Sequence, residues 1–214
     1  MFQIVGRGSM NIKTIISGHE LSQRQREILD CALALLVSSG GNLTMGGLVK
    51  AANCSKETLY NWFGDREGLL IATIQWQASK VGEPKIDLKQ IDIASLENAL
   101  NNFASDLLGV LSSDISVALN RLAISHANSE LGNAVLENGR LAMGRRIKPL
   151  LRAAKKKSLL AYKSDEEAFR TLFGLIVRDV QIRLLLGDKI KYSKAKINKE
   201  ARLAVEQFLT LYQN

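Results

Sequence analysis

Residues 43–70 read LTMGGLVKAANCSKETLYNWFGDREGLL, and the pattern of this stretch decides the fold. Three aromatic residues, Tyr60, Trp62 and Phe63, stand almost side by side in a chain that is only 6% aromatic. If the segment is a helix, successive residues turn by about 100°, so Leu59 and Phe63 share one apolar face. The opposite face presents a cation, an acid, a phenol and an amide, which can bind a base edge or a phosphate. These four residues are Lys56, Glu57, Tyr60 and Asn61.

The spacing within this stretch predicts two short helices joined by a tight turn, at about 44–52 and 55–63. Apolar residues of the first helix can pack against those of the second. Thr44 and Ser55 can cap the two helices, so that free backbone N–H groups and the positive ends of the helix dipoles face a phosphate. Two short helices with a tight turn, placed behind a longer helix, form a helix-turn-helix unit.

Helical periodicity continues on both sides of this unit, and the chain has two prolines and no run of strand-like alternation. A capping box at Ser22 and Gln25 begins a helix that ends at the glycine pair 40–41. After the unit, Asp65 can cap a fourth helix that runs to about residue 80. Longer helices are expected at 95–111, 114–128, 131–157, 165–187 and 198–212, with Pro149 kinking or restarting the third of them. The predicted fold class is all-α.

The helical pattern is interrupted at residues 82–84, Gly-Glu-Pro, which is the best boundary between two domains. Before this boundary we expect a three-helix domain that contains the helix-turn-helix, and after it a longer helical domain. Gly-Arg-Gly-Ser before a second methionine is typical of a non-native leader. The expected parts are this leader at 1–10, the helix-turn-helix domain at 18–64, a connecting helix at 65–81 and the second helical domain at 86–214.

The composition narrows the class of protein. With 214 residues and 46% hydrophobic content, the chain can bury a substantial core. No apolar run reaches the roughly 18 residues that a membrane-spanning helix needs, so no membrane segment is expected. Cys31 and Cys54 are too few for a disulfide framework and have no metal-ligand spacing around them. This favours two buried thiols, no metal or cofactor, and a location in the reducing cytoplasm.

The net charge of +8 does not locate a nucleic-acid surface, because the excess lies late in the chain. Residues 141–200 carry sixteen cations against six anions, in runs such as RRIKPLLRAAKKK. A charge run of this kind is more often a solvated helix face than a binding site. The helix-turn-helix pattern therefore says more than bulk basicity about where DNA would bind.

Over about residues 22–75 the sequence resembles the DNA-binding segment of TetR-type transcriptional regulators. The resemblance implies a ligand-responsive regulator, most typically a repressor, that binds a pseudo-palindromic double-stranded DNA operator as a homodimer. It also implies that phosphates are contacted by Thr44, Ser55, Lys56, Tyr60 and Trp62. The residues implied to lie nearest the bases are Lys56, Glu57, Thr58 and Asn61. The matching positions are Thr44, Ser55, Lys56, Thr58, Leu59, Tyr60, Phe63, Glu67, Leu69 and Leu70.

Three departures from the family pattern are informative. Asn53 stands where glycine is usual, but asparagine tolerates the left-handed conformation that the turn needs. Gly46 and Gly47 replace a commonly charged pair and weaken the first short helix by roughly 1 kcal/mol per glycine relative to alanine. Glu57 takes a place often held by a small residue, so it either accepts a hydrogen bond from a cytosine amine or is tolerated at the rim.

The aromatic cluster has two interpretations, since rings at helical spacing often belong to a core. For Phe63 we expect a core anchor. Trp62 is expected to lie between core and backbone, as an amphipathic ring can. Tyr60 projects from the polar arc of the helix, so its hydroxyl is expected at a phosphate, with a place in the core as the alternative.

The resemblance beyond residue 85 lies in helical architecture, and it implies a domain for ligand binding and dimerisation. The expected helix at 165–187 has two apolar faces and needs two partners, one of them the same helix of another subunit. Expected dimer contacts are Leu175, Ile182, Leu186, Phe208 and Leu211. An effector cavity is expected among residues 95–187, although each candidate polar residue can also be merely structural. These candidates are Asn102, Asn120, Arg121, His126 and Arg178.

No catalytic site is expected. Two histidines far apart in sequence, two unpaired cysteines, no glycine-rich phosphate loop and no metal-ligand spacing leave little with which to build a reaction. The alternative to a DNA-binding regulator is a helical protein–protein interaction module without sequence-specific DNA binding. Salt-dependent binding to a DNA duplex distinguishes these two functions.

Overall fold

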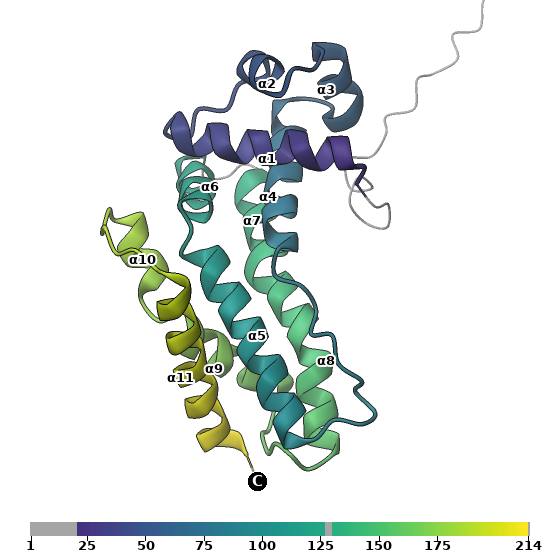
Figure 1. The fold of residues 1–214 in the computed structure, drawn as a ribbon, viewed down its shortest axis with the longest axis vertical. Coiled ribbons are helices and arrows are strands. Elements are labelled where there is room, and N and C mark those ends of the chain that lie inside the picture. The colour runs from purple at the N-terminus through teal and green to yellow at the C-terminus, as the bar shows by residue number, and fades with distance from the viewer. Residues whose placement is uncertain (1–20, 127–129, 214) are drawn as a thin grey trace, which may run out of the picture. The chain divides into compact units, whose positions relative to one another are not determined.

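The computed structural model describes residues 21–126 and 130–213, and Figure 1 shows its ribbon. Within these residues all regular elements are helices, apart from one isolated β-bridge between Leu160 and Gln213. The predicted all-α fold class is confirmed. The leader expected at 1–10 lies outside the described residues.

The chain divides into two compact units, the first ending at Trp76 and the second beginning at Gln77. The first unit holds α1 (Gln23–Ser38), α2 (Met45–Ala52), α3 (Lys56–Phe63) and most of α4 (Arg66–Ser79). The second unit holds α5 (Ile93–Leu111), α6 (Asp114–Ser125), α7 (Glu130–Leu136), the π-helical segment η2 (Glu137–Leu141), α8 (Ala142–Lys156), α9 (Asp165–Val177), α10 (Val180–Leu185) and α11 (Lys194–Tyr212).

The helices of the first unit begin where the sequence signals place them. The Ser22 hydroxyl accepts a hydrogen bond from the amide of Gln25 at 3.2 Å, and the Gln25 side chain accepts one from the amide of Ser22 at 2.9 Å. This reciprocal pair is the predicted capping box. The core of the unit consists of fully buried apolar side chains from all four helices, including Ile28, Leu36, Leu48, Leu59, Phe63 and Leu70.

The turn between α3 and α4 depends on two glycines. Gly64 ends α3 with a φ of 77°, which glycine adopts without steric cost. Gly68 lies so close to the end of α3 that a Cβ atom there would stand 2.1 Å from the carbonyl oxygen of Phe63. The amide of Gly68 donates to the Asp65 side chain at 2.8 Å, as expected of a residue that caps α4.

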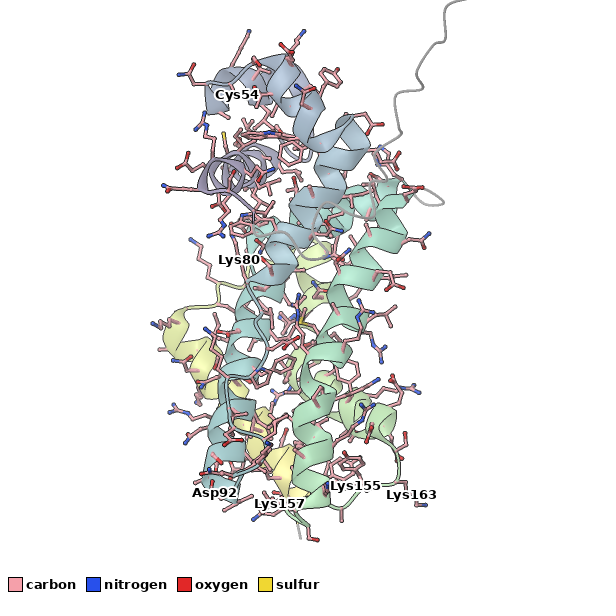
Figure 2. All side chains as sticks on the ribbon, turned by 90° about the vertical axis from the view of Figure 1, so that its right-hand side faces the viewer. Cys54, Lys80, Asp92, Lys155, Lys157 and Lys163 are labelled. Atoms are coloured by element: carbon pink, nitrogen blue, oxygen red, sulfur yellow. The ribbon has the colours of Figure 1, made fainter. Side chains whose placement is uncertain are left out.

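The core of the second unit is formed mainly by α5, α8, α9 and α11, which lie side by side in both Figure 1 and Figure 2. Each helix turns one apolar face inward, so the core is continuous over the length of the unit. Its largest fully buried side chains include Phe169 and Phe208. Gly144 lets α8 approach α9, because a Cβ atom there would lie 3.0 Å from the Phe169 ring.

The single helix expected at 165–187 is two helices, and this prediction was wrong. The chain breaks at Arg178, whose φ of 45° and ψ of −126° lie outside the helical region. The amide of Arg178 closes α9 on the carbonyl of Gly174 at 2.9 Å. Its guanidinium donates to Glu200 of α11 at 2.9 Å, so the side chain is held away from a continuing helix. The apolar pattern alone did not reveal this break, because it continues in register across it.

The interruption expected at Pro149 lies ten residues earlier, at Gly139. This glycine has a ψ of −112° inside η2, between α7 and α8. Pro149 is instead an interior residue of α8. Glycine, which has no Cβ atom, adopts the irregular backbone angle more easily than other residues, so the helix is distorted there.

The two cysteines are half-buried rather than buried, which corrects the expectation of two core thiols. The pKa of Cys31 is raised by burial and by the neighbouring Cys54 thiol, so the neutral thiol is favoured.

In the part of the chain that the structure covers, no helix by itself is long and apolar enough to cross a membrane. Only α5 and α6 together reach that length and apolar character, and the pair is bent by 61°.

The close approach at Gly68 can be tested with Gly68→Ala. We expect a loss of about 3 kcal/mol or more of unfolding free energy, because the new methyl group meets backbone atoms that cannot move aside. Urea unfolding followed by tryptophan fluorescence measures this, since both tryptophans of the chain, Trp62 and Trp76, lie in the first unit.

The matched control is Gly46→Ala in α2, where an added Cβ atom has no neighbour within 4 Å. It should raise stability by up to about 1 kcal/mol, through the lower backbone entropy of the unfolded chain. Equal stability of the Gly68→Ala variant and the parent protein would show that α3 and α4 do not approach as described.

Candidate nucleic-acid interface

The two short helices α2 and α3 each begin at a capping hydroxyl. The Thr44 hydroxyl accepts a hydrogen bond from the amide of Gly47 at 3.1 Å, and the Ser55 hydroxyl accepts one from the amide of Thr58 at 3.0 Å. The absence of a side chain at Gly47 leaves room for this cap, because a Cβ atom there would lie 3.0 Å from the hydroxyl oxygen of Thr44. The remaining first-turn amides of each helix have no intrahelical acceptor and are available to an anion.

The turn between α2 and α3 has the left-handed residue that the sequence predicted. Asn53 ends α2 with φ 47° and ψ 59°, which asparagine tolerates better than most residues. The guanidinium of Arg24, from α1, donates to the carbonyl of Ala52 at 2.6 Å and to that of Asn53 at 3.1 Å. A cation at these carbonyls satisfies the end of α2 and opposes its negative dipole end, which fixes the turn against α1.

Arg24 and Arg66 were missed by the analysis of the sequence. Arg66, the first residue of α4, donates from its Nε atom to the carbonyl of Leu43 at 2.8 Å. It thereby ties the residue just before Thr44 to the helix that follows α3. Nothing in the local pattern signals either contact, because both join residues more than twenty positions apart.

One face of α3 is buried and the other is exposed. Leu59 and Phe63 are fully buried, whereas the Tyr60 side chain is 51% exposed. This geometry excludes the core interpretation of Tyr60. Lys56, Glu57 and Asn61 are exposed beside Tyr60 on the same helix. The structure therefore brings a cation, a carboxylate, a phenol and an amide together on one surface.

Thr58 and Trp62 flank this exposed face. The Thr58 hydroxyl lies 2.9 Å from the Ser55 hydroxyl, so the two side chains form one hydrogen-bonded pair at the start of α3. Trp62 is half-buried, and its ring meets that of Phe63 edge-on at a centroid distance of 6.3 Å. The ring is thus held by the core on one side and open on the other.

Glu57 occupies the first turn of α3. A carboxylate at this position is favourable to the helix, because it lies near the positive end of the dipole. This provides a structural reason for the acid that does not involve a base. Both interpretations of Glu57, base recognition and tolerance at the rim, stay predictions.

The five candidate ligand residues are not brought together. Asn102 is exposed at a cavity between α5 and the segment after α4. Two others serve helix ends: Arg121 donates to the carbonyls of Leu184 and Leu185, and His126 bonds the carbonyl of Leu122. Asn120 donates to the carbonyl of Ser116, and Arg178 pairs with Glu200.

Two buried side-chain oxygens of the second unit were not predicted. Gln77 Oε1 and Asn101 Oδ1 have no hydrogen-bond partner in the structure. Buried acceptors of this kind are usually satisfied by a water or ligand donor, so these positions add to the polar groups that an effector could meet.

Within residues 21–126 and 130–213, no group of three or more His, Cys, Asp or Glu side chains could hold a metal ion.

The expected dimer residues differ in their exposure. Ile182, Leu186 and Leu211 are 55%, 82% and 61% exposed, which is unusual for large apolar side chains. Leu175 is half-buried. Phe208 is fully buried in the core of its own protomer, so it cannot contact a second subunit, and its assignment to a dimer interface is corrected.

Comparison with known proteins identifies relatives. The AefR-like transcriptional repressor C-terminal domain family matches residues 98–214. A TetR transcriptional regulator from Agrobacterium tumefaciens is similar, with 46% identity over 91% of this chain and 96% of that chain and a TM-score of 0.74. A TetR-family regulator from Mesorhizobium loti has 26% identity, coverage of 90% and 98%, and a TM-score of 0.74. The flavonoid-responsive regulator FrrA, at 24% identity, 89% and 97% coverage and a TM-score of 0.63, shares the fold. No curated protein matches.

The two roles of the aromatic cluster can be separated by two substitutions. Tyr60→Phe removes an exposed hydroxyl, so thermal stability should stay unchanged while duplex DNA binding weakens by about 1 to 2 kcal/mol. Phe63→Ala empties a fully buried site and should cost about 3 to 5 kcal/mol of unfolding free energy. Thermal melts and binding curves of both variants provide the measurement. A comparable loss of stability in both would place the Tyr60 hydroxyl in a structural role.

Proposed function

The chain belongs to the TetR family of transcriptional regulators, and from this premise we propose that it is a ligand-responsive repressor. In this proposal it binds a pseudo-palindromic operator as a homodimer and releases it when a small molecule binds the C-terminal unit. One observation carries the DNA-binding part: α3 is anchored by Leu59 and Phe63 and leaves Lys56, Tyr60 and Asn61 exposed on its other face. A rigid helix with such a face suits the major groove.

The residues divide by the chemistry that they offer. Lys56 and the first-turn amides of α2 and α3 can bind phosphates by charge and by hydrogen bonds, as can the Tyr60 hydroxyl. Asn61 offers an amide that can pair with an adenine edge. Thr44 and Ser55 are already used as caps, so we assign them the indirect role of presenting the helix ends, alongside any contact of their own. Trp62 and Thr58 border the same surface.

A homodimer is supported by the exposed apolar residues of α10 and α11 and the segment between them. Exposed leucines such as Leu186 and Leu211 are unfavourable in water unless another surface covers them. A two-fold dimer doubles the number of bases read, because each subunit presents one α3 to one half of a pseudo-palindrome. DNA binding also fits the cytoplasmic location expected from the sequence.

The proposal that a small molecule in the C-terminal unit controls DNA binding is supported by hydrogen bonds between α8 and the end of α4. The Arg146 guanidinium, from α8, donates to the carbonyls of Ala78 at 2.7 Å and Val81 at 2.6 Å. The pKa of Arg146 is lowered by burial, although the group remains charged at any physiological pH. A change in the packing of α8 therefore acts directly on the last turn of the helix that begins at the helix-turn-helix.

Salt dependence tests whether α3 binds DNA. The logarithm of the binding constant should fall linearly with the logarithm of salt concentration, and Lys56→Ala should reduce this slope by about 1. The matched control is Lys156→Ala in the basic run at the end of α8, which should leave the slope unchanged. Operator fragments selected from genomic DNA provide the duplex. A slope that is flat, or that responds only to Lys156, would favour the alternative of a protein–protein interaction module.

The role of Glu57 is tested by Glu57→Gln. Because the carboxylate lies in the first turn of α3 and needs no base partner, we expect stronger binding to every duplex and an unchanged sequence preference. Selection of bound sequences from a random library, compared between the variant and the parent protein, measures this. Loss of preference for one cytosine would instead assign Glu57 to base recognition.

A further inference from the structure

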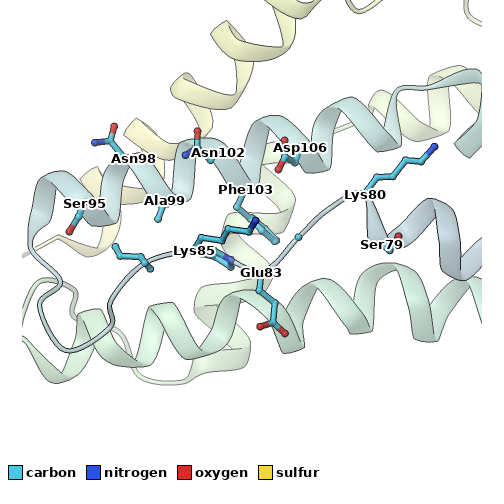
Figure 3. A pocket seen from close by; sticks show the side chains of 13 residues that line it. Ser79, Lys80, Glu83, Lys85, Ser95, Asn98, Ala99, Asn102, Phe103 and Asp106 are labelled. Carbon is cyan, nitrogen blue, oxygen red and sulfur yellow. The ribbon is translucent and has the colours of Figure 1, made fainter. Parts of the chain in front are cut away.

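A polar groove in the second unit lies between α5 and the chain segment that follows α4. Its cavity volume is about 660 Å³, which is within the range of small-molecule sites. In Figure 3, α5 forms one wall with Asn98, Asn102 and Asp106, and the segment with Glu83 and Lys85 forms the other. The polar residues of the groove lie on the side of α5 opposite the core residues Leu100 and Leu107, and the core residue Phe103 forms part of its apolar floor.

The wall on α5 carries a regular ladder of hydrogen-bonding groups. Asn98, Asn102 and Asp106 follow one another at intervals of four residues, so they form one stripe along the helix. With a rise of 1.5 Å per residue, the stripe extends over about 12 Å. None of the three side chains forms a hydrogen bond or ion pair within the structure, although other polar residues of α5 such as Ser95 are paired. Asp106 is exposed, but partial desolvation still raises the pKa of its carboxyl group, since no neighbouring donor or cation offsets it.

The groove is lined by charged groups of both signs. Lys80 and Lys85 provide two cations, and Glu83 and Asp106 provide two carboxylates. A polyanion would meet the carboxylates and a polyamine would meet the ammonium groups, so neither is well matched. Between the two walls lies an apolar strip that includes Ala99 and Phe103. A neutral ligand with many hydroxyl groups and an apolar ring face fits both features.

We propose that this groove binds a neutral polyhydroxylated molecule, a mono- or disaccharide or a cyclic polyol. Each amide of Asn98 and Asn102 offers a donor and an acceptor, as a sugar hydroxyl does, and Asp106 accepts from a further hydroxyl. Lys85 donates from the facing wall. Because Lys80 and Glu83 directly follow α4, occupancy also affects the segment whose Val81 carbonyl is held by Arg146. Through this segment, occupancy of the groove alters operator binding. Only this effect on operator binding rests on the proposed function.

Binding is tested first on the full chain without DNA. Glucose, galactose, trehalose, sucrose and myo-inositol are each examined by saturation-transfer NMR and titration calorimetry, with inorganic phosphate and spermidine as charged probes. We expect at least one neutral compound to bind and the two charged probes not to compete with it. Asn102→Leu and Asp106→Asn should each weaken its binding about tenfold, the effect of losing one hydrogen bond to a polar or charged group.

The control variant is Glu97→Gln, which removes a carboxylate from α5 outside the groove and should leave the affinity unchanged. All the substituted side chains are exposed, so thermal melts should show intact folding. The proposal is overturned if no neutral compound binds, if only phosphate or spermidine binds, or if Asn102→Leu and Asp106→Asn bind as the parent protein does.

The effect on operator binding is measured separately, by DNA binding with and without the identified compound. We expect weaker operator binding, and weaker binding of the compound by the same factor when operator is present, because coupling between two sites is reciprocal. If the compound binds and operator affinity does not change, the groove stands as a binding site and the effector role is wrong. If no operator is bound under any condition, the proposed function fails and the binding result remains.

Discussion

The contact between the end of α3 and the start of α4 is the constraint on which the N-terminal unit depends. The carbonyl of Phe63 and the backbone of Gly68 approach so closely that no side chain fits between them. This closeness sets the direction in which α4 leaves the helix-turn-helix. It also fixes which face of α3 is available to a partner, because Phe63 is held in the core at the same point. The exposed face and the exit of α4 are thus set by one small contact.

Most of the first unit could be predicted because its signals are local. The capping residues Ser22, Thr44 and Ser55 act on amides three positions later, and the left-handed Asn53 is a property of one residue. The polar stripe of α3 follows from helical geometry alone. Arg24 and Arg66 were not predictable in this way, since each donates to a backbone carbonyl that only the folded structure brings near. The candidate DNA surface was therefore foreseen, and the two arginine contacts that brace it were not.

In the second unit, tertiary contacts overrode the local pattern. An unbroken apolar periodicity predicted one helix where Arg178, paired with Glu200, divides two. The basic excess of the last third is partly used in such pairs, including Lys148 with Glu166, Arg152 with Asp165 and Arg183 with Asp188. These exposed pairs each contribute little to stability, but each cation in them is paired with a carboxylate of the same chain. The candidate ligand residues were chosen by polarity alone and stay predictions, and two of them, Arg121 and His126, bond carbonyls near helix ends.

The capping hydroxyls of Thr44 and Ser55 have a consequence for how any signal can be transmitted. Their hydrogen bonds to Gly47 and Thr58 exist before a partner arrives, so the first turns of α2 and α3 do not have to be ordered on association. The two caps therefore hold the first turns of α2 and α3 in place in the free protein. We therefore expect control of such a module to act through the orientation of its helices and not by melting the surface that contacts the partner.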